Sequence, residues 1–144
     1  MDLECELTIA ESVPRGQPAE LTFTLTNRGS GSVKVLTWHT PFEGMKAAMF
    51  TVTRDNNVVD YHGRMFKRGA PRAEDYLQLE AGERKQTTID LGEGWDVSQP
   101  GVYSIEYSSQ LFDVVSGATT TPRSPDHFAS MMPSCNAVSF SRSP

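Results

Sequence analysis

Apolar and polar residues alternate with a period of two over much of the first half of the chain. The segment "LECELTI" (residues 3–9) places its apolar side chains at odd positions. The segment "ELTFTLT" places Leu21, Phe23 and Leu25 on one face and three threonines on the other. Successive side chains of a β-strand point to opposite faces, so this alternation is typical of a half-buried antiparallel strand. We therefore expect two strands near the start of the chain.

The same pattern continues between turn signals to the end of the chain. "FTVTR", a "DNN" turn able to adopt positive φ, and "VVDYHGRM" together predict a hairpin. The segment "DYLQLEAGERKQTTIDL" indicates a strand, an Ala-Gly turn and a second strand. Further strands are expected in "VKVLTW", "PGVYSIEYSS" and "NAVSFSR". Only "EGMKAAM" could form a helical turn. Many short strands with regular turns predict one all-β domain over residues 1–144, an immunoglobulin-like antiparallel β-sandwich of seven to nine strands.

Two segments escape the alternation. Residues 67–75, "KRGAPRAED", form a charged loop, and residues 115–134 form a long irregular loop rich in Ser, Thr and Pro. Structureless loops of about twenty residues are uncommon in compact domains and are usually functional or disordered. Flexible segments of this kind are readily cut by proteases, and we expect the second segment to act as a linker or as a cleavage site.

Composition narrows the possible partners. The net charge is −5, and no clustered basic stripe is present that could displace counterions from nucleic acid. No apolar run approaches the ~18 residues of a membrane span. The acidic start "MDLECELTIAES" lacks the features of a signal peptide. If the protein is secreted or periplasmic, its signal peptide has been removed and Met1 is a replacement.

Catalytic motifs are missing from the sequence. The three histidines, His39, His62 and His127, do not form H-E-x-x-H, and neither a G-x-S-x-G elbow nor a Gly-rich phosphate loop occurs. We therefore expect a non-enzyme without catalytic residues or cofactor, and without a metal site. Asp126 and His127 are the only weak candidates for metal ligands.

The two cysteines, Cys5 and Cys135, lie near opposite ends of the chain. They could form one disulfide closing almost the whole chain, or they could be buried free thiols of a cytosolic protein. The segment "WHTPFEG", residues 38–44, is also open to two interpretations. A histidine and a carboxylate so close together could serve chemistry, or the segment could be a loop that contacts a partner.

Two motifs in this sequence resemble a known family. The run T-W-x-T-P-x-E-G at residues 37–44 and the run Y-x-G-R-x-x-K-R-G-x-P at residues 61–71 are similar to the amino-terminal domain of deuterolysin-like peptidases, the aspzincins, which include the peptidyl-Lys metalloendopeptidases. The resemblance covers residues 3 to 112. In that family the domain is an immunoglobulin-like pro-region before a zinc catalytic domain carrying H-E-x-x-H, which this chain lacks.

The resemblance implies a partner of a protease. We expect a monomeric, secreted or periplasmic pro-domain or stand-alone inhibitor that keeps the catalytic domain of a zinc metalloendopeptidase latent, in cis or in trans. The resemblance also favours the Cys5–Cys135 disulfide. It further favours interpreting "WHTPFEG" as a recognition loop, in which Trp38 ends a strand and buries its ring while residues 39–43 form a projecting tip. The expected partner-binding residues are His39, Thr40, Pro41, Phe42, Glu43, Lys67 and Arg68. The alternatives are an exported immunoglobulin-like adhesion or interaction module with no protease partner, and a small metal-binding or hydrolytic protein that uses Asp126 and His127.

Overall fold

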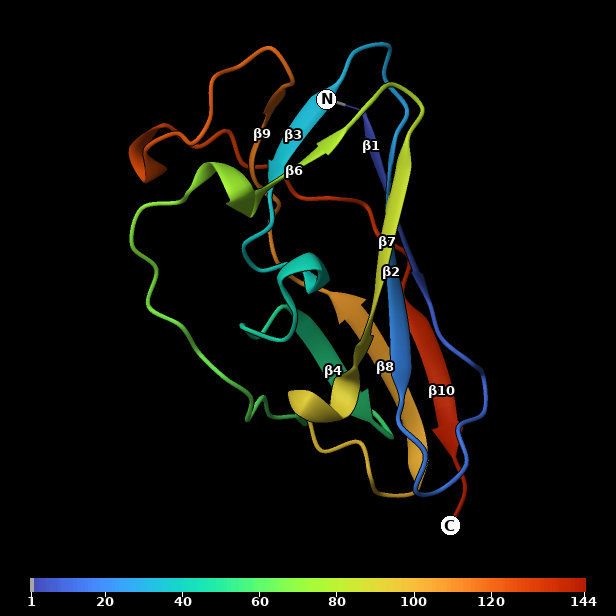
Figure 1. Cartoon of the computed structure of the whole chain (residues 1–144). Helices are drawn as coiled ribbons and strands as arrows, with labels where there is room; N and C mark the ends of the chain where they lie inside the picture. The colour runs from blue at the N-terminus through green and yellow to red at the C-terminus, as the bar shows by residue number, and fades with distance from the viewer. Residues whose placement is uncertain (1) are drawn as a thin grey trace.

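Ten β-strands and four single-turn 3-10 helices form the computed structural model, which describes residues 2–144 (Figure 1). The elements in chain order are β1 (Leu3–Thr8), β2 (Glu20–Asn27), β3 (Val33–Leu36), η1 (Pro41–Glu43), β4 (Phe50–Arg54), β5 (Asn57–Val59), η2 (Ala73–Asp75), β6 (Tyr76–Leu79), β7 (Arg84–Asp90), η3 (Leu91–Glu93), β8 (Gly101–Tyr107), β9 (Phe112–Ser116), η4 (Pro125–His127) and β10 (Val138–Arg142). Within residues 2–144 no helix has the length and apolar character needed to cross a membrane. The all-β class is confirmed.

The strands form two layers in which every strand pairing is antiparallel. One layer is the sheet β1-β2-β7, and the other consists of the sheets β10-β8-β4-β5 and β6-β3-β9. Because β3 pairs with β9 and β4 pairs with β8, the second layer is built on one long pair of strands that is interrupted halfway. Residues 37–49 interrupt one strand of this pair and residues 108–111 interrupt the other. Figure 1 shows the two halves beside the β1-β2-β7 sheet.

The alternating apolar positions meet between the layers, as the sequence predicted. Leu21, Phe23 and Leu25 of β2 and Tyr103 and Ile105 of β8 are fully buried. The "DNN" turn also adopts the expected positive φ, at Asp55 (49°) and Asn56 (69°), and joins β4 to β5. Such φ values match the right-handed twist of the two flanking strands.

Five local expectations were wrong. Residues 44–49 form no helical turn, and η1 ends at Glu43. The strand after the "DNN" turn was expected over residues 58–65 but ends at Val59. The strand β9 was not expected at all. Trp38 is only partly buried, and Trp95 is the core tryptophan, packed against Phe50 and Tyr61. Thr24 and Thr26 are buried although they occupy the outer face, because β2 is the central strand of its sheet and has neighbours on both sides.

The Cys5–Cys135 disulfide is confirmed, with the two α-carbons 4.6 Å apart. Cys135 precedes β10 and forms an isolated parallel bridge with Cys5. The side chain of Asn136 then accepts a hydrogen bond from the N–H of Leu7 (2.8 Å) and donates one to its carbonyl (2.9 Å). The disulfide and the two hydrogen bonds of the Asn136 side chain therefore hold the segment before β10 along the edge of β1. The side-chain amide makes the hydrogen bonds to Leu7 that the backbone of a neighbouring strand would otherwise make.

Candidate interaction face

The "WHTPFEG" segment is an insertion between β3 and β4, rather than the projecting tip that the sequence suggested. Thr40 is fully buried and donates from Oγ1 to the carbonyl of Thr37 (2.7 Å). Pro41 is buried as well. The Phe42 ring lies edge-on to Phe23 in the core, with ring centroids 5.7 Å apart. These three side chains hold the turn against the sandwich and present little surface to a partner.

His39 and Glu43 fix the shape of this turn. His39 has a φ of 59°, in the left-handed region, and its N–H donates to Oε2 of Glu43 (2.7 Å). Its carbonyl accepts a hydrogen bond from the hydroxyl of Tyr107 (2.7 Å). Burial, together with the positive charge of Arg68, lowers the pKa of His39, and Glu43 partly opposes this shift. The lowered pKa favours the neutral form of this histidine, which lies in a preformed turn.

Arg68 links this turn to the distant loop after β5. Its Nη2 lies 2.5 Å from Oε2 of Glu43, whose side chain is 7% exposed. Its guanidinium also lies over two aromatic rings, 5.2 Å from the centroid of Trp38 and 5.9 Å from that of Phe66. Arginine suits such a position because its planar group stacks on rings while it pairs with a carboxylate. The two segments that the sequence assigned to one surface are thus joined at Arg68.

A cluster of aromatic rings adjoins this junction. Trp38 contacts Phe128 edge-on (6.0 Å between centroids), Phe128 contacts Phe112 (6.4 Å), and Phe112 contacts His39 (5.1 Å). These four residues are half-buried, whereas Phe66 is 45% exposed and Lys67 is exposed. We call the surface formed by Trp38, His39, Phe66, Lys67, Arg68, Phe112 and Phe128 the aromatic face.

A buried carboxylate supports the far end of the aromatic face. Asp113 of β9 is fully buried at a register shift opposite β3, with a φ of 45°. It accepts hydrogen bonds from Tyr76 (2.6 Å), from Arg123 (2.8 Å) and from the N–H of Ala129 (3.0 Å). Burial alone would raise the pKa of Asp113, but these donors hold it below its ordinary value. Burial and then the hydrogen bond to Asp113 raise the pKa of Tyr76 to about 12.

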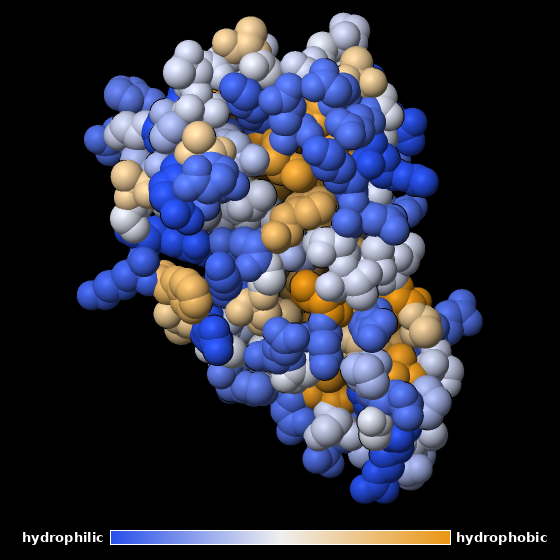
Figure 2. Space-filling view, viewed as in Figure 1, coloured by the Kyte–Doolittle hydropathy of each residue, from blue (hydrophilic) through white to orange (hydrophobic). Residues whose placement is uncertain are grey.

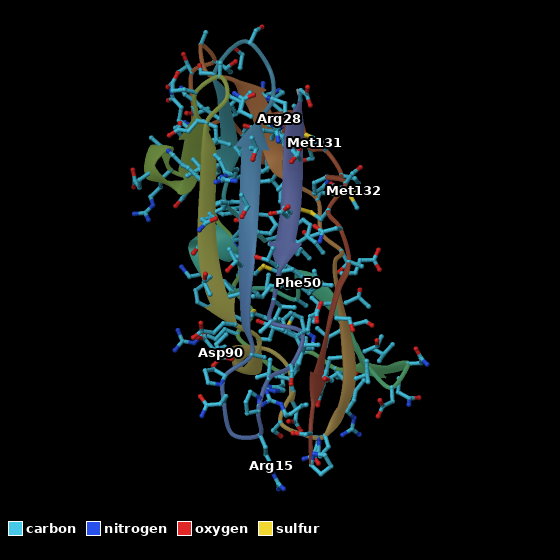
Figure 3. The ribbon with its side chains drawn as sticks, turned by 90° about the vertical axis from the view of Figure 1, so that its right-hand side faces the viewer. Arg15, Arg28, Phe50, Asp90, Met131 and Met132 are labelled. Carbon is cyan, nitrogen blue, oxygen red and sulfur yellow. A yellow bond between two sulfur atoms is a disulfide. The ribbon has the colours of Figure 1, made fainter. Side chains whose placement is uncertain are left out.

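The segment after β9 is consequently tied down at several points. Arg123 and Ala129 bind Asp113, and Met131 pairs with Leu111 through two backbone hydrogen bonds. Figure 3 shows the stretch that carries Met131 and Met132 running beside the β1-β2-β7 sheet. Sequence reasoning missed this anchoring because its central residue, Asp113, lies in a strand without alternation.

Asp126 and His127 lie on η4 and are exposed. Within the described chain, no group of three His, Cys, Asp or Glu side chains is arranged to hold a metal ion.

A pocket of about 430 Å³ lies at the other end of the sandwich, below β7, and includes His62, Asp90, Asp96 and Arg142 in its lining. Figure 3 labels Asp90 at this end. Arg142 is buried and donates to the carbonyls of Val97, Pro14 and Gln17. Asp96 accepts from Ser98. Because Arg142 and Asp96 are engaged by their own neighbours, we take the aromatic face as the stronger candidate for binding. Figure 2 shows that small patches of hydrophobic residues are exposed on an otherwise mostly hydrophilic surface.

No family model matches this sequence. Over 105 residues the chain is 36% identical to "Extracellular protease" from Aeromonas hydrophila, a match that covers 73% of this chain and 30% of that protein. The chain thus corresponds to less than a third of this extracellular relative.

Solved structures that can be superposed on this chain include the CARDB domain of PF1109 from Pyrococcus furiosus, determined in complex with di-metal ions. It has a TM-score of 0.40 at 16% identity, with 99% of this chain and 93% of that chain covered. A beta-glucosidase from Listeria innocua gives a TM-score of 0.39 at 10% identity, with 99% of this chain and 16% of that chain covered.

Proposed function

We propose that this chain is a non-catalytic domain that binds the catalytic part of a secreted zinc endopeptidase of the aspzincin type and keeps that enzyme latent. The observation that carries the proposal is the 36% identity to an extracellular protease over a segment making up 30% of that protein. The disulfide supports an oxidising, extracytoplasmic location.

The aromatic face is the proposed contact surface. Aromatic side chains and arginine are the residues that most often dominate binding energy at protein interfaces. On this face the turn is held by hydrogen bonds before a partner arrives, so little conformational entropy remains to be lost on association. Phe66 and Lys67 offer the most accessible groups, one apolar and one charged.

The residues expected from the sequence divide into two roles in this proposal. His39, Lys67 and Arg68 lie on the aromatic face and would contact the enzyme. Thr40, Pro41, Phe42 and Glu43 would act behind it, because they are packed beneath the face or bonded to His39 and Arg68. Trp38, Phe112 and Phe128 join the contact set from the structure alone.

The test is titration of active Aeromonas hydrophila extracellular protease with the purified domain, while the hydrolysis of a peptide is followed. We expect saturable inhibition that weakens when Lys67→Ala is used. Val58→Ala is the matched control, since Val58 on β5 is 71% exposed and lies outside the aromatic face. Unchanged hydrolysis at a large excess of domain would refute the latency function and favour an interaction module without a protease partner.

A further inference from the structure

The loop that joins β5 to η2 stands away from the body of the domain. Between the hydrogen bond from His62 N–H to the carbonyl of Gly94 and the buried Pro71, residues 63–70 belong to no strand or 3-10 helix. We call residues 63–70 the strap. In Figure 1 it forms part of the green chain that swings out at the left.

Hydrogen bonding barely restrains the strap. Residues 65–70 make no backbone hydrogen bond to any described residue. Met65 is 82% exposed and Phe66 is 45% exposed. Side chains hold the strap at three points: Arg68 pairs with Glu43, the Phe66 ring contacts Lys46 and Arg68, and the carbonyl of Arg64 accepts a hydrogen bond from Tyr61. The Nε of Arg68 finds no acceptor within residues 2–144. Segments with exposed, unpaired backbone open at low cost and are preferred sites of proteolysis.

Four lysines occur in the chain, and three of them are engaged. Lys34 in β3 donates from Nζ to the carbonyl of Thr119 (2.9 Å), and Lys85 in β7 donates to that of Gln78 (2.7 Å). Lys46 lies over the Phe66 ring (5.4 Å) and is flanked by the buried residues Met45 and Ala47. Lys67 is exposed at the centre of the unbonded strap, and its Nζ makes no contact of this kind with the described residues.

We propose that Lys67 is a processing site at which an endopeptidase reading a lysine side chain cuts the strap. Hydrolysis of the bond after Lys67 consumes one water: the C–N bond breaks, Lys67 gains a carboxylate and the nitrogen of Arg68 becomes an ammonium group. The long segment after β9, which the sequence suggested for this role, is the poorer substrate because Asp113 and Leu111 hold it in place.

Such a cut leaves the sandwich assembled. Each of the three sheets contains a pairing that crosses the cut, namely β2 with β7, β4 with β8, and β3 with both β6 and β9. Cys5 and Cys135 lie on opposite sides of it, so the disulfide joins the two fragments covalently. The product is a two-chain domain of the same fold.

The cut does pass through the aromatic face. The cut would place a new carboxylate on Lys67 and a new ammonium group on Arg68, both beside the Arg68–Glu43 pair, and would change the local charges there. Arg68 would then no longer be held from both sides by a continuous chain. Resting on the proposed function, this implies that cleavage at Lys67 releases the inhibited protease while the domain stays folded.

The probe is a lysine-specific endopeptidase used at low ratio on the native, oxidised domain, with the products mapped by mass spectrometry. We expect the first cut at Lys67, giving two bands on a reducing gel and one band on a non-reducing gel. Lys67→Gln should slow the first cut at least tenfold, whereas the matched variant Lys85→Gln should leave it unchanged. A first cut at Lys34, Lys46 or Lys85, or equal rates for Lys67→Gln and the unmodified domain, would overturn the assignment.

The nicked, unreduced domain is then compared with the intact domain in the peptide-hydrolysis assay. At least tenfold weaker inhibition by the nicked form is expected, and equal inhibition would overturn the release step. The cleavage map is read independently of inhibition. A domain that never inhibits would therefore refute the latency function without altering the result at Lys67.

Discussion

Arg123 donates two hydrogen bonds to the fully buried Asp113, from Nη2 and from Nε to Oδ1 at distances of 2.8 and 3.1 Å. The two residues are ten positions apart, on β9 and on the segment that follows it. Their pairing orients the loop whose Phe128 contacts Trp38 on the aromatic face. A fully buried carboxylate, paired with a partly exposed arginine, thus positions part of a surface.

Asp113→Asn should lower the free energy of unfolding by about 2–3 kcal/mol, because the buried amide cannot replace the charge-assisted bonds to Arg123, Tyr76 and Ala129. Urea denaturation followed by tryptophan fluorescence measures the loss. The control is Glu4→Gln, which breaks the exposed pair with Arg28 and should cost less than about 1 kcal/mol. Equal losses in the two variants would contradict a structural role for Asp113.

The same carboxylate predicts a dependence of stability on pH. Its pKa is lower in the folded protein than the ~3.9 of an unfolded chain, so between these two values the unfolded state binds more protons. Its stabilising contribution is complete above about pH 5 and is lost as the pH falls through 3.9 towards the folded pKa. The stability difference between the unmodified domain and Asp113→Asn should therefore shrink between pH 5 and pH 2.5. A difference that stays constant or widens in acid would exclude this explanation.

Replacing both cysteines by alanine should lower the free energy of unfolding by about 5 kcal/mol, the chain-entropy value for a loop of 130 residues. Urea titration of the double variant and of the oxidised domain gives the difference. Asn136→Ala is the companion variant, since it removes two hydrogen bonds to Leu7 but keeps the covalent link. It should cost about 1–3 kcal/mol. A loss below 1 kcal/mol in the double variant would show that the unfolded chain is not constrained by the bridge.

The sequence predicted the strands best where alternation and turn chemistry agreed. β1, β2, β4 and β8 show a clear period of two, and the "DNN" turn fixes the hairpin after β4. β9 could not be recognised, because "FDVVS" contains no alternation and the register shift at Asp113 turns a carboxylate into the interior. A lone aspartate in an apolar run was the signal available for it.

The aromatic face was only half predictable, for a physical reason. The motifs around Glu43 and Arg68 indicated one surface, and the ion pair joins them. The sequence did not show that residues 37–49 interrupt a long strand in mid-sheet instead of capping a hairpin. Because of this placement, Phe42, which the sequence suggested would project outward, packs against Phe23 in the core. Phe66, from the loop after β5, is instead the exposed phenylalanine of the face.

Replacing either of two phenylalanines by alanine distinguishes a role in core packing from a role in binding at this face. Phe42→Ala removes a ring that contacts Phe23 and should lower the free energy of unfolding by about 2–4 kcal/mol. Phe66→Ala removes a ring that is 45% exposed, so stability should change by less than about 1 kcal/mol. If the aromatic face binds the protease, the same Phe66→Ala variant should weaken inhibition by about 1–3 kcal/mol, as expected for an interface anchor. Denaturation and inhibition are measured on both proteins under conditions in which each is fully folded. If Phe42→Ala weakens inhibition while Phe66→Ala leaves it unchanged, the contact surface lies on the turn after β3 and not on the strap.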